Sequence, residues 1–176
     1  MKMQSAVNSR IITLAILIGF VIFLVGKSSA GEFKVIRVYD GDTINAVNDE
    51  NEIKVRLVGI DAPETKKGKR NPGQPYSQRA KKFLASMVLN KSVDVKEYGK
   101  DRYGRILGVV YLDKTDVNLE MIKACLAEVY RGRQPKGLPI YLYREVEKEA
   151  IRVGKGVWSL GDKYVSPKVW RKEHRR

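Results

Sequence analysis

The stretch of sequence that determines the fold reads IKVRLVGIDAPET and covers residues 53–65. Its first half has an apolar residue at every second position, which is the period of a β-strand with one buried face: Ile53, Val55 and Leu57. Pro63 then biases the residue before it toward extended backbone. The strand is therefore expected to end in a rigid corner that holds two carboxylates, Asp61 and Glu64.

This strand cannot be regular along its whole length if its polar residues serve one site. Arg56 and Asp61 are separated by an odd number of positions, and strict alternation places such residues on opposite faces. A bulge or turn between them would bring both side chains to the same side, and Gly59 is well suited to it. We therefore predict an irregularity at that point.

Patterns on both sides of this stretch predict the remaining elements. Two strands precede it, separated by the turn Asp40-Gly41-Asp42, and a long hairpin follows, with its turn at residues 99–104. Apolar residues at helical spacing predict three helices, at residues 76–89, 117–126 and 138–153. This inventory is that of an α+β protein, a five-stranded OB-fold barrel with about three packed helices.

The composition favours some partners and argues against several kinds of chemistry. The chain has 176 residues and a formal net charge of +14, and such a field attracts polyanions, either nucleic acid or an anionic membrane. It has one histidine, His174, and one cysteine, Cys125. A single histidine argues against a histidine-based mechanism. A single cysteine argues against an intramolecular disulfide and a cysteine zinc site. A metal site would have to use oxygen ligands, which suit Ca²⁺ or Mg²⁺.

The first 30 residues have the pattern of an export signal. Lys2 and Arg10 precede an uncharged apolar run at residues 11–25, and small residues up to Ala30 follow. We predict cleavage after Ala30 and an exported protein, secreted or periplasmic. The alternative is that the run at 11–25 is retained as a membrane anchor, with the folded domain outside and its basic face held near the membrane. The run is shorter than the ~20 residues that span a bilayer comfortably.

The rest of the chain divides into a folded domain at residues 31–165 and a basic C-terminal tail at residues 166–176. The tail is expected to add nonspecific affinity for a polyanion and nothing more. We expect the protein to be a monomer.

Acidic side chains stand at the ends of neighbouring predicted strands. Taken singly, each has an ordinary explanation as part of a turn. Together, Asp42 and Asp61 can converge, and with the Ala62 carbonyl and water they could bind Ca²⁺. Glu64 lies two residues beyond Ala62 and could act as a general base on a water beside that metal.

Two arginines complete the set that hydrolysis of a phosphodiester needs. Arg56 lies in the third strand and Arg105 on the return limb of the hairpin. Their guanidinium groups could bind the phosphate oxygens on which charge accumulates in the transition state. A nucleic-acid-binding module without catalysis, built on the same barrel, is the alternative. In such a binding module the carboxylates would repel phosphate unless a metal lay between them. The presence of Asp42, Asp61 and Glu64 together with both arginines therefore favours an enzyme.

Three motifs in this order resemble the signatures of the staphylococcal nuclease family: VYDGDT at residues 38–43, VRLVGIDAPET at 55–65 and DRYGR at 101–105. The later segments LAEVY, at 126–130, and GVWS, at 156–159, are similar to landmarks of the same family. The resemblance implies an OB-barrel endonuclease that acts on DNA and RNA, with Ca²⁺ as its cofactor.

The resemblance also implies a role for each matching residue. It implies calcium ligation by Asp42, Asp61 and the carbonyl of Ala62. It implies Glu64 as the proposed general base, and phosphate binding by Arg56 and Arg105.

The chain departs from the family pattern in two places. Ala62 stands where the reference enzyme of the staphylococcal nuclease family has Thr. This change should be tolerated, because the implied metal ligand at this position is the backbone carbonyl. The reference enzyme has two spaced tyrosines that contact the nucleotide, whereas this chain has only Tyr130 nearby. Tyr130 is therefore one predicted substrate-binding residue, and Tyr103 of the DRYGR motif is the other.

Overall fold

The computed structural model describes residues 32–66, 68 and 72–174. The predicted export segment at residues 1–30 lies outside this range, and so does the apolar run at 11–25. Within the described residues, none of the helices is long and apolar enough to cross a membrane.

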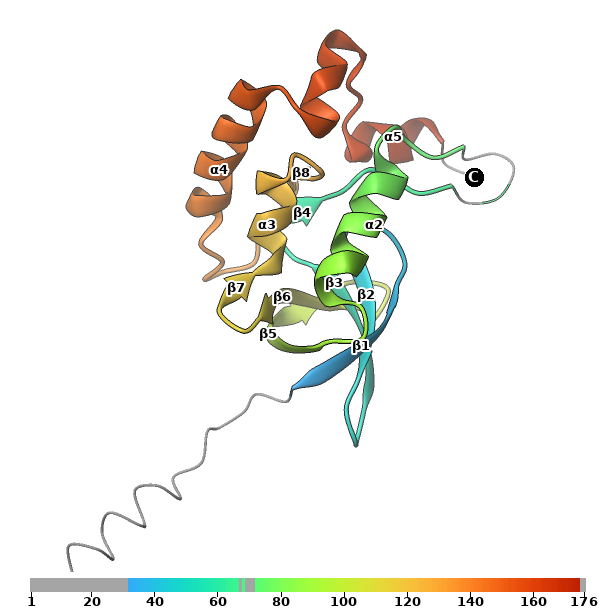
Figure 1. Cartoon of the computed structure of the whole chain (residues 1–176), viewed down its shortest axis with the longest axis vertical. Coiled ribbons are helices and arrows are strands. Elements are labelled where there is room, and N and C mark those ends of the chain that lie inside the picture. Colours follow the sequence, from blue (N-terminus) through green and yellow to red (C-terminus); the bar gives the residue numbers. More distant parts are fainter. Residues whose placement is uncertain (1–31, 67, 69–71, 175–176) are drawn as a thin grey trace, which may run out of the picture.

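Five strands close into a barrel, which occupies the lower half of Figure 1. They lie in the order β3-β2-β1-β5-β6, and a parallel pairing between β3 and β6 closes the ring. The α+β, five-stranded OB-fold barrel of the prediction is confirmed. The strands are β1 (Phe33–Val38), β2 (Thr43–Val47), β3 (Glu52–Leu57), β5 (Ser92–Lys100) and β6 (Ile106–Leu112).

Three short strands lie outside the ring. β7 (Thr115–Asp116) extends the sheet beyond β6, and β4 (Ile60–Asp61) pairs with β8 (Glu128–Val129). In this small ladder Asp61 lies opposite Glu128. The pairing fixes the backbone of the acidic corner to a segment that is far away in the sequence.

The barrel is filled by the apolar residues that alternate along its strands. Burial of each such side chain contributes about 1.5–3 kcal/mol through removal of apolar surface from water. The residues of this core with almost no exposure include Val35, Ile44, Val55, Leu57, Val93 and Val110.

The three predicted helices are present, and two of them pack directly on the barrel. They are α2 (Ser77–Val88), α3 (Val117–Lys123) and α4 (Ile140–Val153). α2 buries Ala80, Leu84 and Val88, which lie four residues apart and therefore on one face. Figure 1 shows α2 and α3 above the barrel and α4 packed beyond α3.

The chain after α4 differs from the prediction. A 3₁₀ segment, η1 (Gly156–Lys163), follows, and the part expected to be a solvated basic tail contains a further helix, α5 (Pro167–Glu173). Ser166 caps α5 by accepting a hydrogen bond from the amide of Val169, and proline at the first position suits a helix start. Serine followed by proline is a helix-start signal that the excess of basic residues obscured.

The predicted irregularity after β3 is present. β3 ends at Leu57, β4 begins at Ile60, and between them Gly59 has a φ of +83°. A side chain there would also lie 2.9 Å from the Tyr143 ring. Glycine is needed on both counts. The break turns the chain, so that Arg56 and Asp61 can meet.

Asn118 connects α3 to the barrel at this break. Its side chain is fully buried. It donates to the carbonyls of Val58 and Gly108 and accepts from the amide of Val110. The Gly108 carbonyl also accepts from the Val58 amide at 2.9 Å. The Asn118 side chain thus joins backbone groups of two segments at a point where regular pairing stops.

Replacement of Asn118 by alanine should therefore destabilise the protein by about 2–4 kcal/mol, because buried polar groups lose their partners. Asn48 is a matched control, since its side chain accepts hydrogen bonds only in an exposed turn. Urea unfolding followed by circular dichroism measures both variants. Equal losses of stability for Asn118→Ala and Asn48→Ala would contradict the role given to Asn118.

Candidate active site

Asp42 is fixed at the turn between β1 and β2. Its carbonyl accepts a 2.8 Å hydrogen bond from the Leu57 amide, and its carboxylate accepts one of 2.8 Å from the Ala62 amide. A side chain at Gly41 would lie 2.6 Å from the β-carbon of Ala62. The Asp-Gly-Asp turn can approach the acidic corner only because its central residue is glycine.

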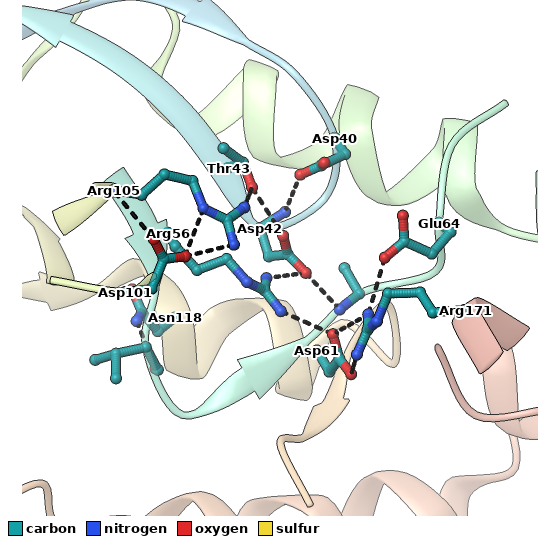
Figure 2. Close-up of polar contacts among 12 residues, drawn as sticks. Asp40, Asp42, Thr43, Arg56, Asp61, Glu64, Asp101, Arg105, Asn118 and Arg171 are labelled. Carbon is teal, nitrogen blue, oxygen red and sulfur yellow. Dashed lines mark hydrogen bonds and ion pairs between the residues drawn. The ribbon is translucent and has the colours of Figure 1, made fainter. Parts of the chain in front are cut away.

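Arg56 joins the two buried carboxylates. Its guanidinium forms an ion pair with Asp42 and donates to Asp61 at 2.7 Å, as Figure 2 shows. The Asp61 side chain has no exposure and that of Arg56 has 12%. Burial lowers the pKa of Arg56 below its ordinary value, while Asp61 and Asp40 act against that shift. The sequence-predicted residues Asp42, Arg56 and Asp61 thus form one connected group.

Arg105 lies beside this group and is held by Asp101. The guanidinium makes contacts of 2.8 and 2.7 Å with one oxygen of Asp101. It also reaches the Thr43 hydroxyl at 3.5 Å, and that hydroxyl donates to Asp42. Burial acts to raise the pKa of Asp101, but hydrogen bonds from Arg105 and Tyr103 outweigh it and hold that pKa below its ordinary value. Arg105 is therefore preorganised at the edge of the site, with a quarter of its side chain exposed.

Glu64 stands at the end of the corner and is positioned by Gln74. The Glu64 amide donates to the Gln74 side chain and the Glu64 carbonyl accepts from the Gln74 amide, each at 2.8 Å. Gln74 is almost fully buried. The reciprocal pair fixes the backbone of Glu64 although the loop between the two residues is long. The prediction did not include Gln74.

Arg171 of α5 is a second residue of the site that was not predicted from the sequence. Its guanidinium contacts both oxygens of Asp61, at 2.9 and 2.7 Å, and donates to Glu64 at 2.8 Å. Figure 2 shows it on the side of Asp61 away from Asp42. Burial acts against its charge, yet the hydrogen bonds to Asp61 and Glu64 raise the pKa of Arg171 above its ordinary value. One arginine among many in a basic segment carries no signal that sets it apart.

A further carboxylate, that of Glu128, belongs to the residue paired with Asp61. Glu128 is buried opposite Asp61 in the β4–β8 ladder and accepts a 2.8 Å hydrogen bond from the Tyr164 hydroxyl. Burial raises the pKa of Glu128 to about 7, against the effect of that hydrogen bond. The site therefore holds more acidic groups than the motifs alone indicate.

The two predicted substrate-binding tyrosines lie in different surroundings. Tyr103 has 68% exposure, and its ring lies 5.6 Å from the guanidinium carbon of Arg105. The amide of Tyr130 donates to the Gly59 carbonyl, and a side chain at Gly132 would lie 2.4 Å from the Tyr130 ring. Tyr103 thus lies beside Arg105, whereas Tyr130 packs close to Gly132. Their roles toward a substrate stay predictions.

The groups of the site that could bind a metal ion are all oxygen atoms. Within the described residues, no three His, Cys, Asp or Glu side chains are gathered closely enough to hold a metal ion. Instead, guanidinium groups lie between the carboxylates of Asp42, Asp61 and Glu64. Carboxylate oxygens that accept one cationic group are chemically suited to another, and such ligands favour hard divalent cations.

The chain is similar to known proteins over most of its length. The family model described as "Staphylococcal nuclease homologue" matches residues 54–160. The chain belongs to the staphylococcal nuclease family. An "uncharacterized endonuclease" of Haemophilus influenzae is 34% identical over 96% of this chain and 89% of its own length. The thermonuclease of Staphylococcus hyicus is 38% identical over 76% of this chain and 80% of its own length. A micrococcal nuclease of Shigella flexneri is 36% identical over 79% and 81%.

Membership of this family identifies the protein as a nuclease and an enzyme of the hydrolase class. The matched region begins in β3 and ends in η1. It therefore includes Arg56, Asp61, Glu64 and Arg105. It does not include α5 or Arg171.

Removal of the Asp61 charge should destabilise the protein in chelator. Asp61→Asn removes one of the two buried carboxylates that pair with Arg56 and one of the two carboxylates that pair with Arg171, which should cost about 3–5 kcal/mol. The control is Glu145→Gln, because Glu145 pairs with Lys148 on the exposed face of α4, where a pair contributes less than about 1 kcal/mol. Chemical unfolding measures both. An Asp61→Asn protein as stable as the control would show that the buried network is not needed to hold the fold.

Proposed function

We propose that this nuclease is a calcium-dependent endonuclease that hydrolyses phosphodiester bonds in DNA and RNA. The observation that carries the proposal is the convergence of Asp42 and Asp61 on Arg56. Arg105 reaches Asp42 through the Thr43 hydroxyl, and Glu64 is joined to Asp61 through Arg171. A protein that only binds nucleic acid has no use for buried carboxylates at its phosphate site.

Asp42, Asp61 and the Ala62 carbonyl are the groups that would hold Ca²⁺. All three provide hard oxygen, and the two carboxylates already share one cationic partner, Arg56. When bound, the ion would neutralise a phosphate oxygen and polarise the phosphorus. The Ala62 amide donates to Asp42, so the backbone that would offer the carbonyl is held in place by the neighbouring carboxylate.

Arg56 and Arg105 are the proposed phosphate-binding groups. Arg56 lies in β3 and Arg105 in the turn just before β6. Both are held by carboxylates, Arg56 by Asp42 and Asp61 and Arg105 by Asp101. Fixed guanidinium forks of this kind can stabilise the equatorial oxygens of the transition state without reorganisation. Arg105 is partly exposed and lies beside the exposed ring of Tyr103, so a nucleotide could reach both from solvent.

Glu64 is the proposed general base. It lies at the edge of the network and not in its buried centre, since its side chain has 12% exposure where Asp61 has none. A carboxylate in that position can accept a proton from a water attacking the phosphorus. Gln74 holds the backbone of Glu64, so the carboxylate can change partner without moving the corner.

The proposal includes an exported location, secreted or periplasmic, or a membrane-anchored form with the nuclease domain outside. The proposed location rests on the pattern of residues 1–30. The protein is also proposed to be a monomer. Fractionation of cells tests the location. Nuclease in the cytoplasm, at the size of the full chain, would contradict export.

Plasmid nicking tests the chemistry. Supercoiled DNA should be cleaved with Ca²⁺ and left intact with chelator, and Glu64→Gln should lower kcat by about 10²–10⁴-fold because the base is lost. Glu149→Gln, on the exposed face of α4, should leave cleavage unchanged.

Each contrary outcome removes a different part of the proposal. Cleavage in chelator would refute the role of a metal, and full activity of Glu64→Gln would refute the base. Cleavage with Mg²⁺ alone would refute only the choice of ion. Binding of DNA without cleavage under all conditions would identify a nucleic-acid-binding module.

A further inference from the structure

Helix α5 returns to the acidic corner although it lies beyond the matched family region. Arg171 contacts both oxygens of Asp61 and one of Glu64. These are the residues assigned above to the metal and to the general base. A guanidinium that binds them occupies the same carboxylate oxygens that a divalent cation and a water molecule would need.

We propose that α5 is an autoinhibitory latch, in which Arg171 binds the carboxylates of Asp61 and Glu64 until a divalent cation displaces it from Asp61. The inference rests on the proposed function, because it concerns the regulation of the same site. Arg171 is thus a competitor of the metal and no part of the catalytic machinery.

The charges of the site favour an exchange over simultaneous binding. The three carboxylates of Asp42, Asp61 and Glu64 face two guanidinium groups, those of Arg56 and Arg171. One unit of negative charge is therefore left over. Among these five groups, replacement of Arg171 by a divalent cation balances the charge, whereas addition of the cation without release of Arg171 leaves one positive charge in excess. Asp40 and Glu128 lie nearby and would offset part of that excess.

α5 is held in a way that permits release. Of its residues only Pro167, at the start, is buried, and Val169 has 45% exposure. The side chain of Arg171 itself is 35% exposed. Trp170 is partly buried as well. A short helix with one fully buried residue depends largely on its polar contacts for its position, and their loss favours its release.

The segment before α5 is anchored, which keeps the helix near the site after release. The Gln74 side chain donates to the Val165 carbonyl at 2.8 Å, and the Tyr164 hydroxyl donates to Glu128. The Tyr164 ring also packs against Trp158, with 4.9 Å between ring centroids. α5 can therefore pivot close to Val165 while the chain up to that residue stays in place.

Gln74 links the latch to the general base. The same side chain accepts from the Glu64 amide and donates to the Val165 carbonyl. The attachment point of α5 and the corner that holds Glu64 are thus joined by one buried residue. This arrangement explains how a segment after the barrel finds the site in a reproducible position.

The test compares Arg171→Ala with Lys172→Ala in the purified protein. Lys172 is exposed on the same helix and carries the same charge, so it controls for the loss of one positive charge. Titration calorimetry with Ca²⁺ should show roughly tenfold tighter binding for Arg171→Ala than for the wild type, because a competing state is removed. Lys172→Ala should change the affinity less than about twofold, since exposed charges are screened.

Hydrogen–deuterium exchange of α5 gives a second readout that does not depend on cleavage. In the wild type, Ca²⁺ should accelerate exchange over residues 167–173. In Arg171→Ala, exchange in this segment should already be fast without Ca²⁺ and should not respond to it. Lys172→Ala should behave as the wild type does.

Several results would overturn the latch. If Ca²⁺ binds and supports cleavage while α5 stays protected, the latch is wrong and the proposed function stands. If Arg171→Ala binds Ca²⁺ no more tightly than Lys172→Ala, Arg171 does not compete with the metal. If Arg171→Ala loses cleavage at every Ca²⁺ concentration, Arg171 belongs to the catalytic machinery. Absence of Ca²⁺ binding in both variants and in the wild type would overturn the metal proposal together with the latch.

Discussion

Asp61 has a side chain without solvent exposure, so its charge has to be balanced inside the fold. Two guanidinium groups do this, Arg56 from β3 and Arg171 from α5. Much of the local architecture follows from the requirement. The chain has to turn at Gly59 for Arg56 to reach Asp61. The β4–β8 ladder has to hold the backbone of Asp61 while its side chain is shared by two partners.

The contacts of the site fall into two kinds. Backbone hydrogen bonds fix the frame, as between Leu57 and Asp42, or between Glu64 and Gln74. Ion pairs between side chains fill the frame, and under the proposed function a metal and a phosphate would take the place of some of them. A fixed frame with exchangeable cations is what an enzyme needs if it is to accept a metal and a phosphate in turn.

The barrel and the central residues could be predicted because their signals are local. Alternation in residues 53–57 and helical spacing at 76–89 reflect burial of one face, which the sequence records directly. The break at Gly59 followed from geometry, since Arg56 and Asp61 could not otherwise share a site. The structure brings together Asp42, Arg56, Asp61 and Glu64, and places Arg105 beside them.

Long-range polar contacts were beyond such prediction. Arg171 lies 110 positions from Asp61, and Gln74 lies 91 from Val165. Nothing in the local pattern around either residue distinguishes it from a solvated neighbour. α5 is a seven-residue helix with one buried residue, so it has no apolar periodicity by which it could be recognised. Its position depends on charge and on a glutamine that joins two distant segments.

The central claim is that the buried carboxylates around Arg56 form the nuclease centre. The most direct measurement is a crystal structure with Ca²⁺ and a short non-hydrolysable oligonucleotide. The ion should lie about 2.3–2.6 Å from oxygens of Asp42, Asp61 and the Ala62 carbonyl, with a phosphate on Arg56 and Arg105. An ion bound elsewhere, or a phosphate that lies away from both arginines, would contradict the claim.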